Sequence, residues 1–204
     1  MPSRNVIKEY APQSYYHVYA RGNSQQKIFL EASDYHRFLQ LFERYLSTEP
    51  AYSQTGERYP NFRNQIKLLS YCLMSNHFHL LIYQEGMDDL KRFMQSLMTS
   101  YSRYFNLKHK RSGSLFETRY KASRIDRDTY LQHITRYIHL NPRRWQSYRY
   151  SSLSYYIHGH APEWLTTKPI LDVFLSRKEY KEFVEDYQGL RNELAELKYQ
   201  LADL

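Results

Sequence analysis

The chain has 204 residues, a formal net charge of +8 and 42% hydrophobic residues. This length suffices for one compact domain with an appendage and is too short for two large domains. A single cysteine, Cys72, excludes a disulfide framework and a cysteine-based zinc site. The N-terminus has no apolar signal core and no apolar run reaches membrane-spanning length, so we expect a soluble, cytoplasmic protein with no membrane partner.

Basic residues are concentrated in one part of the chain. Residues 1–160 contain 23 lysines and arginines against 12 acidic residues, whereas residues 161–204 contain 6 against 9. The segment 101–149 is the most basic, and aromatic residues are interleaved with its charges. Basic side chains neutralise phosphates and aromatic rings stack on unpaired bases. Solvated helix faces are the alternative explanation, but the pattern favours a nucleic-acid partner and a nucleoid-associated location.

The first elements are predicted from composition and spacing. Residues 15–23 are rich in β-forming aromatic residues and end in a Gly-Asn turn, which predicts a strand. A helix is expected to begin near Asp34, with Ser33 as its cap, because apolar residues follow at helical spacing. Residues 50–64 contain prolines, glycine and asparagines, which indicates a polar loop or a ragged hairpin.

Two further strands are predicted at residues 66–74 and 77–83, with a link of two residues between them. So short a link requires antiparallel pairing. Because strand side chains alternate between faces, His77 and His79 point the same way. Two imidazoles on one sheet face form half of a metal site, which needs further ligands from a facing element.

The central part of the chain is predicted to be mostly helical. A helix spans about residues 87–109, where apolar residues recur at helical spacing, and residues 112–114 break it. Residues 115–124 are expected to form a short strand or an extended loop. A second helix then runs over about residues 126–140 and ends before Pro142.

Tyr137 and Asn141 lie four residues apart on one face of this last helix. A tyrosine nucleophile, a metal site and a basic chain together suggest phosphodiester chemistry on nucleic acid. Other interpretations stay open: Tyr137 can be a packed core residue, and Asn141 can satisfy backbone groups at the helix end. His133, one turn before Tyr137, can be an additional ligand, a proton relay or merely a packed side chain.

The C-terminal part is predicted to be an irregular stretch over residues 143–163 and then helical from about Lys168. Five leucines near the end are spaced 4-3-4-3, the pattern of a coiled-coil seam, at Leu190, Leu194, Leu197, Leu201 and Leu204. This seam fits a homodimer contact or a helix docked on its own domain. We therefore expect a catalytic domain over residues 1–160 and a helical extension over residues 161–204.

Four motifs occur in a fixed order along residues 13–155: Met74-Ser-Asn-His-Phe-His-Leu-Leu, Tyr101-Ser-Arg-Tyr-Phe-Asn, Gly113-Ser-Leu-Phe-Glu-Thr-Arg-Tyr-Lys and Tyr137-Ile-His-Leu-Asn-Pro. The His-Phe-His segment resembles the HUH motif (His, hydrophobic, His) of single-tyrosine HUH transposases. The whole layout resembles the REP-associated tyrosine transposases of the IS200-like group. A lone His-x-His is weak evidence, whereas four ordered motifs are strong evidence.

The resemblance implies an α+β, ferredoxin-like domain with an antiparallel sheet that carries the histidines and with helices packed on one face. It implies a divalent cofactor, Mg²⁺ or Mn²⁺, and cleavage and transfer of single-stranded DNA at REP-like hairpin repeats through a 5′-phosphotyrosine intermediate. His77 and His79 match the metal ligands and Tyr137 matches the nucleophile. Asn141 matches a third ligand, where related transposases carry a glutamine that is one methylene longer.

Basic residues near these motifs are the candidate DNA contacts. We expect Arg119 and Arg136 to bind phosphate near the site, Lys121 to help position the DNA, and Arg143 and Arg144 to hold the strand beyond the helix. The main alternative function is a hairpin-binding protein that has the same fold and no turnover. A replication-initiator or relaxase nickase and a zinc hydrolase are further alternatives that the sequence supports less.

Overall fold

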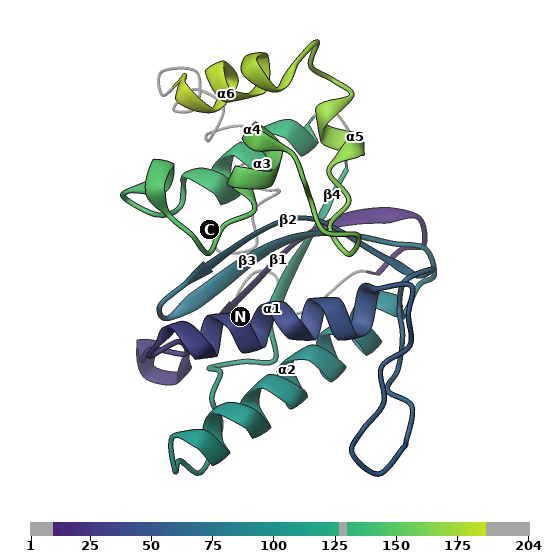
Figure 1. Ribbon diagram of the computed structural model, residues 1–204, viewed down its shortest axis with the longest axis vertical. Helices are drawn as coiled ribbons and strands as arrows, with labels where there is room; N and C mark the ends of the chain where they lie inside the picture. Colours follow the sequence, from purple (N-terminus) through teal and green to yellow (C-terminus); the bar gives the residue numbers. More distant parts are fainter. Residues whose placement is uncertain (1–9, 127–129, 187–204) are drawn as a thin grey trace, which may run out of the picture.

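Strand, helix and strand follow one another twice along the chain, in a computed structural model that describes residues 10–126 and 130–186 (Figure 1). The elements in order are β1 (Ser14–Arg21), α1 (Ala32–Leu46), β2 (Ile66–Met74), β3 (His77–Gln84), α2 (Asp89–Lys108) and β4 (Lys121–Ile125). The sheet has the order β2-β3-β1-β4, and each neighbouring pair is antiparallel. This is the α+β, ferredoxin-like sheet that was expected from the sequence.

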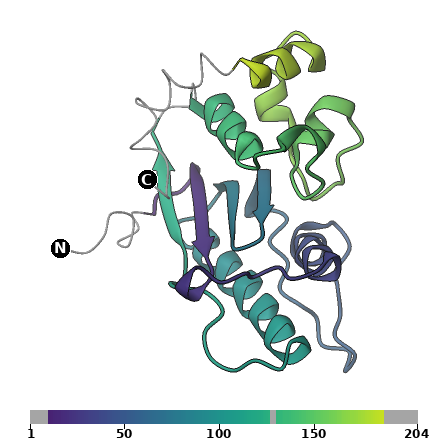
Figure 2. The same ribbon diagram turned by 90° about the vertical axis from the view of Figure 1, so that its left-hand side faces the viewer.

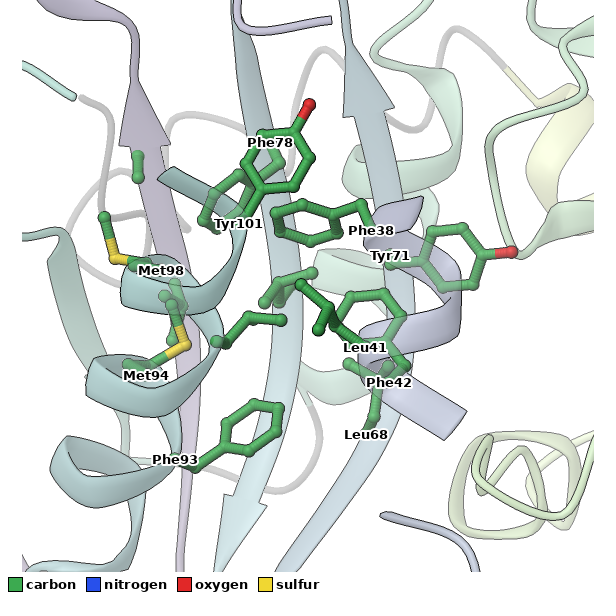
Figure 3. Close-up of a cluster of buried hydrophobic side chains, with 14 of the residues drawn as sticks. Phe38, Leu41, Phe42, Leu68, Tyr71, Phe78, Phe93, Met94, Met98 and Tyr101 are labelled. Atoms are coloured by element: carbon green, nitrogen blue, oxygen red, sulfur yellow. The ribbon is translucent and has the colours of Figure 1, made fainter. Parts of the chain in front are cut away.

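Helices α1 and α2 cover one face of the sheet. Alternate residues of β1 and β3, such as Val18 and Phe78, point to this face and are fully buried. Aromatic and aliphatic side chains of both helices pack there against those of the sheet (Figure 3). The labelled members of this cluster are Phe38, Leu41, Phe42, Leu68, Tyr71, Phe78, Phe93, Met94, Met98 and Tyr101. Burial of this apolar surface is the main source of stability for the domain.

The later helices lie on the opposite side of the sheet (Figures 1 and 2). These are α3 (Leu131–Leu140), α4 (Leu153–His158), α5 (Lys168–Leu171) and α6 (Arg177–Glu185). Leu69, Cys72 and Leu81 of the sheet pack there against Ile134 and Ile138 of α3. The expected one-sided packing therefore holds for α1 and α2, whereas α3 packs on the other face because that face also carries apolar side chains.

Several predicted boundaries differ from the structure. Helix α1 begins at Ala32, one residue before the expected cap Ser33, and Glu31 is its N-cap. The backbone N–H of Glu31 donates a hydrogen bond to the carboxylate of Asp34 at 3.2 Å. Strand β4 is shorter than the expected segment 115–124 and begins at Lys121. Residues 143–163 are not irregular throughout, because α4 lies within them.

Part of the C-terminal extension packs on the sheet and on α3. The backbone N–H of Thr166 donates to the carbonyl of Leu68 at 2.8 Å, and α6 contacts both α3 and α4. The leucine seam at residues 190–204 lies outside the described residues, so the homodimer stays a prediction. Within residues 10–126 and 130–186, no helix is long and apolar enough to cross a membrane.

Candidate active site

Three histidines lie together on the sheet face that α3 covers. His77 and His79 come from β3, and His17 comes from the adjacent strand β1. Nε2 of His17 lies 3.0 Å from Nδ1 of His79, and the two rings are stacked with their centroids 5.2 Å apart. Both of these side chains are fully buried. His17 holds the ring of His79 in one orientation, with its Nε2 atom directed away from β1.

The side chain of Asn141 bridges the two motif histidines. Its Oδ1 atom lies 3.2 Å from Nε2 of His77, and its Nδ2 atom lies 3.1 Å from Nε2 of His79. On the far side of its ring, His77 places Nδ1 2.7 Å from Oδ1 of Asn76. The amide of Asn141 therefore binds the imidazoles, and its hydrogen bonds do not go to the backbone groups at the end of α3.

Tyr137 lies against the same histidines. Its ring meets His17 edge-on at a centroid distance of 5.9 Å and His79 at 5.7 Å. The side chain is half-buried. Because residues four apart share one face of a helix, α3 presents both Tyr137 and Asn141 to the histidines. The structure thus brings together all four residues that the motifs single out.

The environment of His79 keeps its imidazole neutral. Burial, and to a smaller extent the neighbouring His17 and His77, holds the pKa of His79 well below its usual range. A neutral imidazole offers the lone pair that a metal ion binds. Within the described ranges 10–126 and 130–186, no group of three His, Cys, Asp or Glu side chains is placed to hold a metal. The amide oxygen of Asn141, 3.2 Å from Nε2 of His77, is the candidate third ligand among the described residues.

The expected DNA contacts occupy three different environments. Nζ of Lys121 lies 5.9 Å from the ring centroid of Tyr19, which itself packs on His79, so Lys121 is at the site. Arg143 and Arg144 are exposed just beyond the end of α3. Arg119 is exposed, but it lines a cavity of about 510 Å³ together with residues of α2, the helix on the opposite face of the sheet. Its expected role at the site is therefore not supported.

The expected role of Arg136 as a DNA contact is wrong in this structure. Its side chain is fully buried, and Nη1 donates to the backbone carbonyls of Phe183 at 2.9 Å and Asp186 at 3.4 Å. Its guanidinium carbon also lies 4.0 Å from the ring centroid of Phe183. His133 packs on the same phenylalanine ring, at 5.4 Å, and does not join the histidine group. Arg136 thus fixes α3 to α6.

His139, a buried histidine of α3, strengthens this attachment. Nδ1 of His139 lies 2.7 Å from the hydroxyl of Tyr180 in α6, and its Nε2 lies 2.7 Å from Oγ of Ser152. Burial lowers the pKa of His139 to about 3. The residue is a structural group of the helix interface, because its two ring nitrogens are both occupied by hydroxyl groups.

Replacing His139 with glutamine is expected to lower stability at pH 7 and to weaken the acid sensitivity of the fold. The unfolded histidine has a pKa of about 6.5, so below that pH the unfolded state binds a proton that the folded state excludes. Stability due to this group is fully present above about pH 6.5 and falls by up to about 1.4 kcal/mol per pH unit on the way to pH 3. Urea unfolding at pH 7, 6 and 5 would measure the free energy of unfolding, which should change less steeply with pH in the variant than in the wild type.

His160→Gln, at an exposed position, is the control for this experiment. An equal pH dependence of the unfolding free energy in H139Q and in the wild type would contradict the assignment.

His17 and Tyr19 are site residues that sequence reasoning missed. Both lie on β1, two residues apart, and the predicted strand included them. Strand alternation alone places them on one face, but only the sheet order shows that this face adjoins His79. The signal in the sequence was therefore the His-x-Tyr spacing in β1. This spacing does not show which strand lies next to β3.

Comparisons with known proteins agree with the fold. A solved structure described as a REP-associated tyrosine transposase bound to a REP hairpin is similar, with a TM-score of 0.58 and 13% sequence identity; the match covers 80% of this chain and 91% of that one. At this identity the likeness concerns the fold alone. A search among curated proteins gave no match. A model of the family described as IS200-like transposases matches residues 10–141, a range that contains the whole histidine group, Tyr137 and Asn141.

Proposed function

Because the chain belongs to the IS200-like transposase family, we propose that it cleaves and rejoins single-stranded DNA at hairpin-forming repeats through a covalent intermediate on Tyr137. The observation that carries the proposal is the position of α3: it holds Tyr137 against His79 and places the amide of Asn141 between the two motif imidazoles. A tyrosine beside a potential metal position supports a metal-assisted transesterification.

A divalent metal fits the residues that are present. The Nε2 atoms of His77 and His79 both face the side chain of Asn141, whose oxygen is a suitable third donor. When bound, Mg²⁺ or Mn²⁺ would polarise the phosphate and neutralise the negative charge that develops on it. Imidazole nitrogen is a better ligand for Mn²⁺ than for Mg²⁺, so the donor atoms of this site favour Mn²⁺. His17 and Asn76 support the site from behind, since each occupies the Nδ1 atom of one imidazole and leaves its Nε2 atom for the metal.

The chemistry assigned to Tyr137 is a balanced transesterification. Its phenol oxygen forms a bond to phosphorus and loses its proton to solvent, while the bond from phosphorus to the 3′ oxygen breaks. The 3′ oxygen takes a proton and leaves as a free 3′-OH, and the 5′ phosphate remains on the tyrosine. The number of phosphodiester bonds is unchanged, so attack by another 3′-OH reverses the step and gives strand transfer instead of hydrolysis. A phenol has a pKa of about 10, which is why the phosphate must be activated for the reaction at neutral pH.

The proposed substrate is a DNA hairpin with an unpaired flank. The similar solved structure is described as bound to a REP hairpin, and the basic residues Lys121, Arg143 and Arg144 lie at or just beyond the site in this chain. Cations bind the phosphates of any sequence, so these residues support a nucleic-acid substrate without specifying its sequence. A transposition or recombination step on such repeats is the reaction that this family membership supports.

The test is direct detection of a protein–DNA adduct. Labelled single-stranded hairpins from repeats that flank the gene are incubated with the full chain and Mn²⁺, separated under denaturing conditions, and the attached nucleotide is mapped by peptide mass spectrometry. We expect an adduct on Tyr137 that a chelator prevents and that the fully double-stranded version of the same DNA does not form. Tight hairpin binding without an adduct under any metal would favour the binding-protein alternative. Hydrolysis supported by zinc and independent of Tyr137 would favour a zinc hydrolase.

A further inference from the structure

Arg21 lies beside the histidine group and was not among the expected site residues. It is the last residue of β1 and the cross-strand partner of His77. Because side chains alternate along a strand, Arg21 is on the same face as His17 and Tyr19. Its guanidinium carbon lies 5.6 Å from the ring centroid of Tyr19, so the side chain runs along the sheet toward the site.

The ring of Tyr19 connects two basic side chains to the histidines. Its centroid lies 5.6 Å from that of His77 and 5.0 Å from that of His79. Lys121, the cross-strand partner of Tyr19 on β4, holds its Nζ atom 5.9 Å from the same ring. Arg21 and Lys121 thus border one aromatic ring that contacts both motif histidines, and they form a small basic area next to these histidines.

Arg21 has no anionic partner among residues 10–126 and 130–186. Its half-buried side chain makes no ion pair there, and its Nε atom is buried without a hydrogen-bond partner. A cation that has lost part of its hydration without gaining a carboxylate is under-satisfied, and binding an anion would compensate that loss. The fork of a guanidinium matches two oxygens of a phosphate better than an ammonium does.

We propose that Arg21 is a catalytic residue that binds the non-bridging oxygens of the phosphate attacked by Tyr137, and that Lys121 binds the next phosphate of the strand. This inference rests on the proposed transesterase function. The position opposite His77 places Arg21 at the attacked phosphate, whereas Lys121 lies one strand further out on β4. Fixed donors aimed at developing phosphoryl charge stabilise the transition state more than the ground state.

The experiment compares Arg21→Gln with the wild type on two substrates in single-turnover adduct formation at saturating protein. One substrate has a natural phosphate at the cleaved linkage, and the other has a neutral methylphosphonate there. On the phosphate we expect the variant to be slower by about 100-fold. On the methylphosphonate, which carries no negative charge for Arg21 to bind, the two proteins should react at similar rates. Arg21→Lys, which keeps the charge and loses the fork, should be intermediate on the phosphate.

Lys67→Gln is the matched control, because Lys67 lies over Tyr83 in the same way, with Nζ 5.0 Å from the ring centroid, at the far end of the same sheet. It should react like the wild type on both substrates. Equal rates for R21Q and the wild type on the phosphate would overturn the inference, and so would an equal loss on both substrates, which indicates a structural role. A wild-type protein that forms no adduct at all would instead contradict the proposed function, and this inference with it.

Discussion

Replacing Tyr137 with phenylalanine is expected to abolish the covalent adduct and leave hairpin affinity within about a factor of two. The substitution removes only the attacking oxygen and keeps the ring that packs edge-on against His17 and His79. The position of α3 and the basic residues near the site should be unchanged. Adduct formation on a denaturing gel and hairpin binding in solution would be measured on the same preparations.

Tyr83→Phe is the matched control for this experiment. Tyr83 lies on β3, like His77 and His79, but at the far end of the strand, where its hydroxyl donates to Glu85 at 3.0 Å. We expect this variant to form the adduct at the wild-type rate. An adduct that persists in Tyr137→Phe would show that another of the 22 tyrosines or another nucleophile performs the step, and the assignment of Tyr137 would then be wrong.

Replacing Asn141 with leucine is expected to slow adduct formation by about 100-fold and to raise the Mn²⁺ concentration needed for half-maximal activity. Leucine has nearly the same shape as asparagine but offers no oxygen to a metal. It also removes the contacts of the amide with His77 and His79 at 3.2 and 3.1 Å. Metal titrations of the rate, with thermal unfolding measured alongside, separate loss of a ligand from loss of folding.

Asn141→Asp is the informative companion to the leucine variant. It keeps an oxygen at the same distance along the side chain and adds a negative charge, so Mn²⁺ binding should be retained. If the leucine and aspartate variants were both as active as the wild type, the side chain would have no ligand role, and the contacts seen with the imidazoles would only help to hold α3 in place.

The sequence allowed the two halves of the site to be predicted separately, but it did not show that they contact each other in the fold. Alternation along a strand put His77 and His79 on one face, and helical spacing put Tyr137 and Asn141 on one face of a helix. That these two faces oppose each other was implied only by the resemblance, because no local pattern reveals which side of a sheet a later helix covers. The same limit explains why His17 was missed, since its place depends on β1 lying beside β3.

Arg136 shows a different limit of sequence reasoning. In a basic segment next to a proposed nucleophile, an arginine is naturally interpreted as a phosphate contact. Adjacent residues on a helix point in different directions, however, and Arg136 faces away from the sheet toward α6. Its planar, weakly hydrated guanidinium can be buried against the ring of Phe183 and two backbone carbonyls. Only the packing of the C-terminal extension, which the motifs do not cover, makes this clear.

Helix α3 is attached to the histidine group on one side and to α6 on the other, so its position depends on both contacts. The inner side of the helix is joined to the histidines through Asn141, and its outer side is joined to α6 through Arg136 and His139. A displacement of α6 is therefore expected to move the phenol of Tyr137 relative to the histidines, although no residue of α6 is among the proposed catalytic groups. Catalytic output then becomes sensitive to distant events, such as a partner bound to α6 or a cut in the chain after α4. For the proposed transesterase, such control at a distance would limit adduct formation between encounters with its substrate.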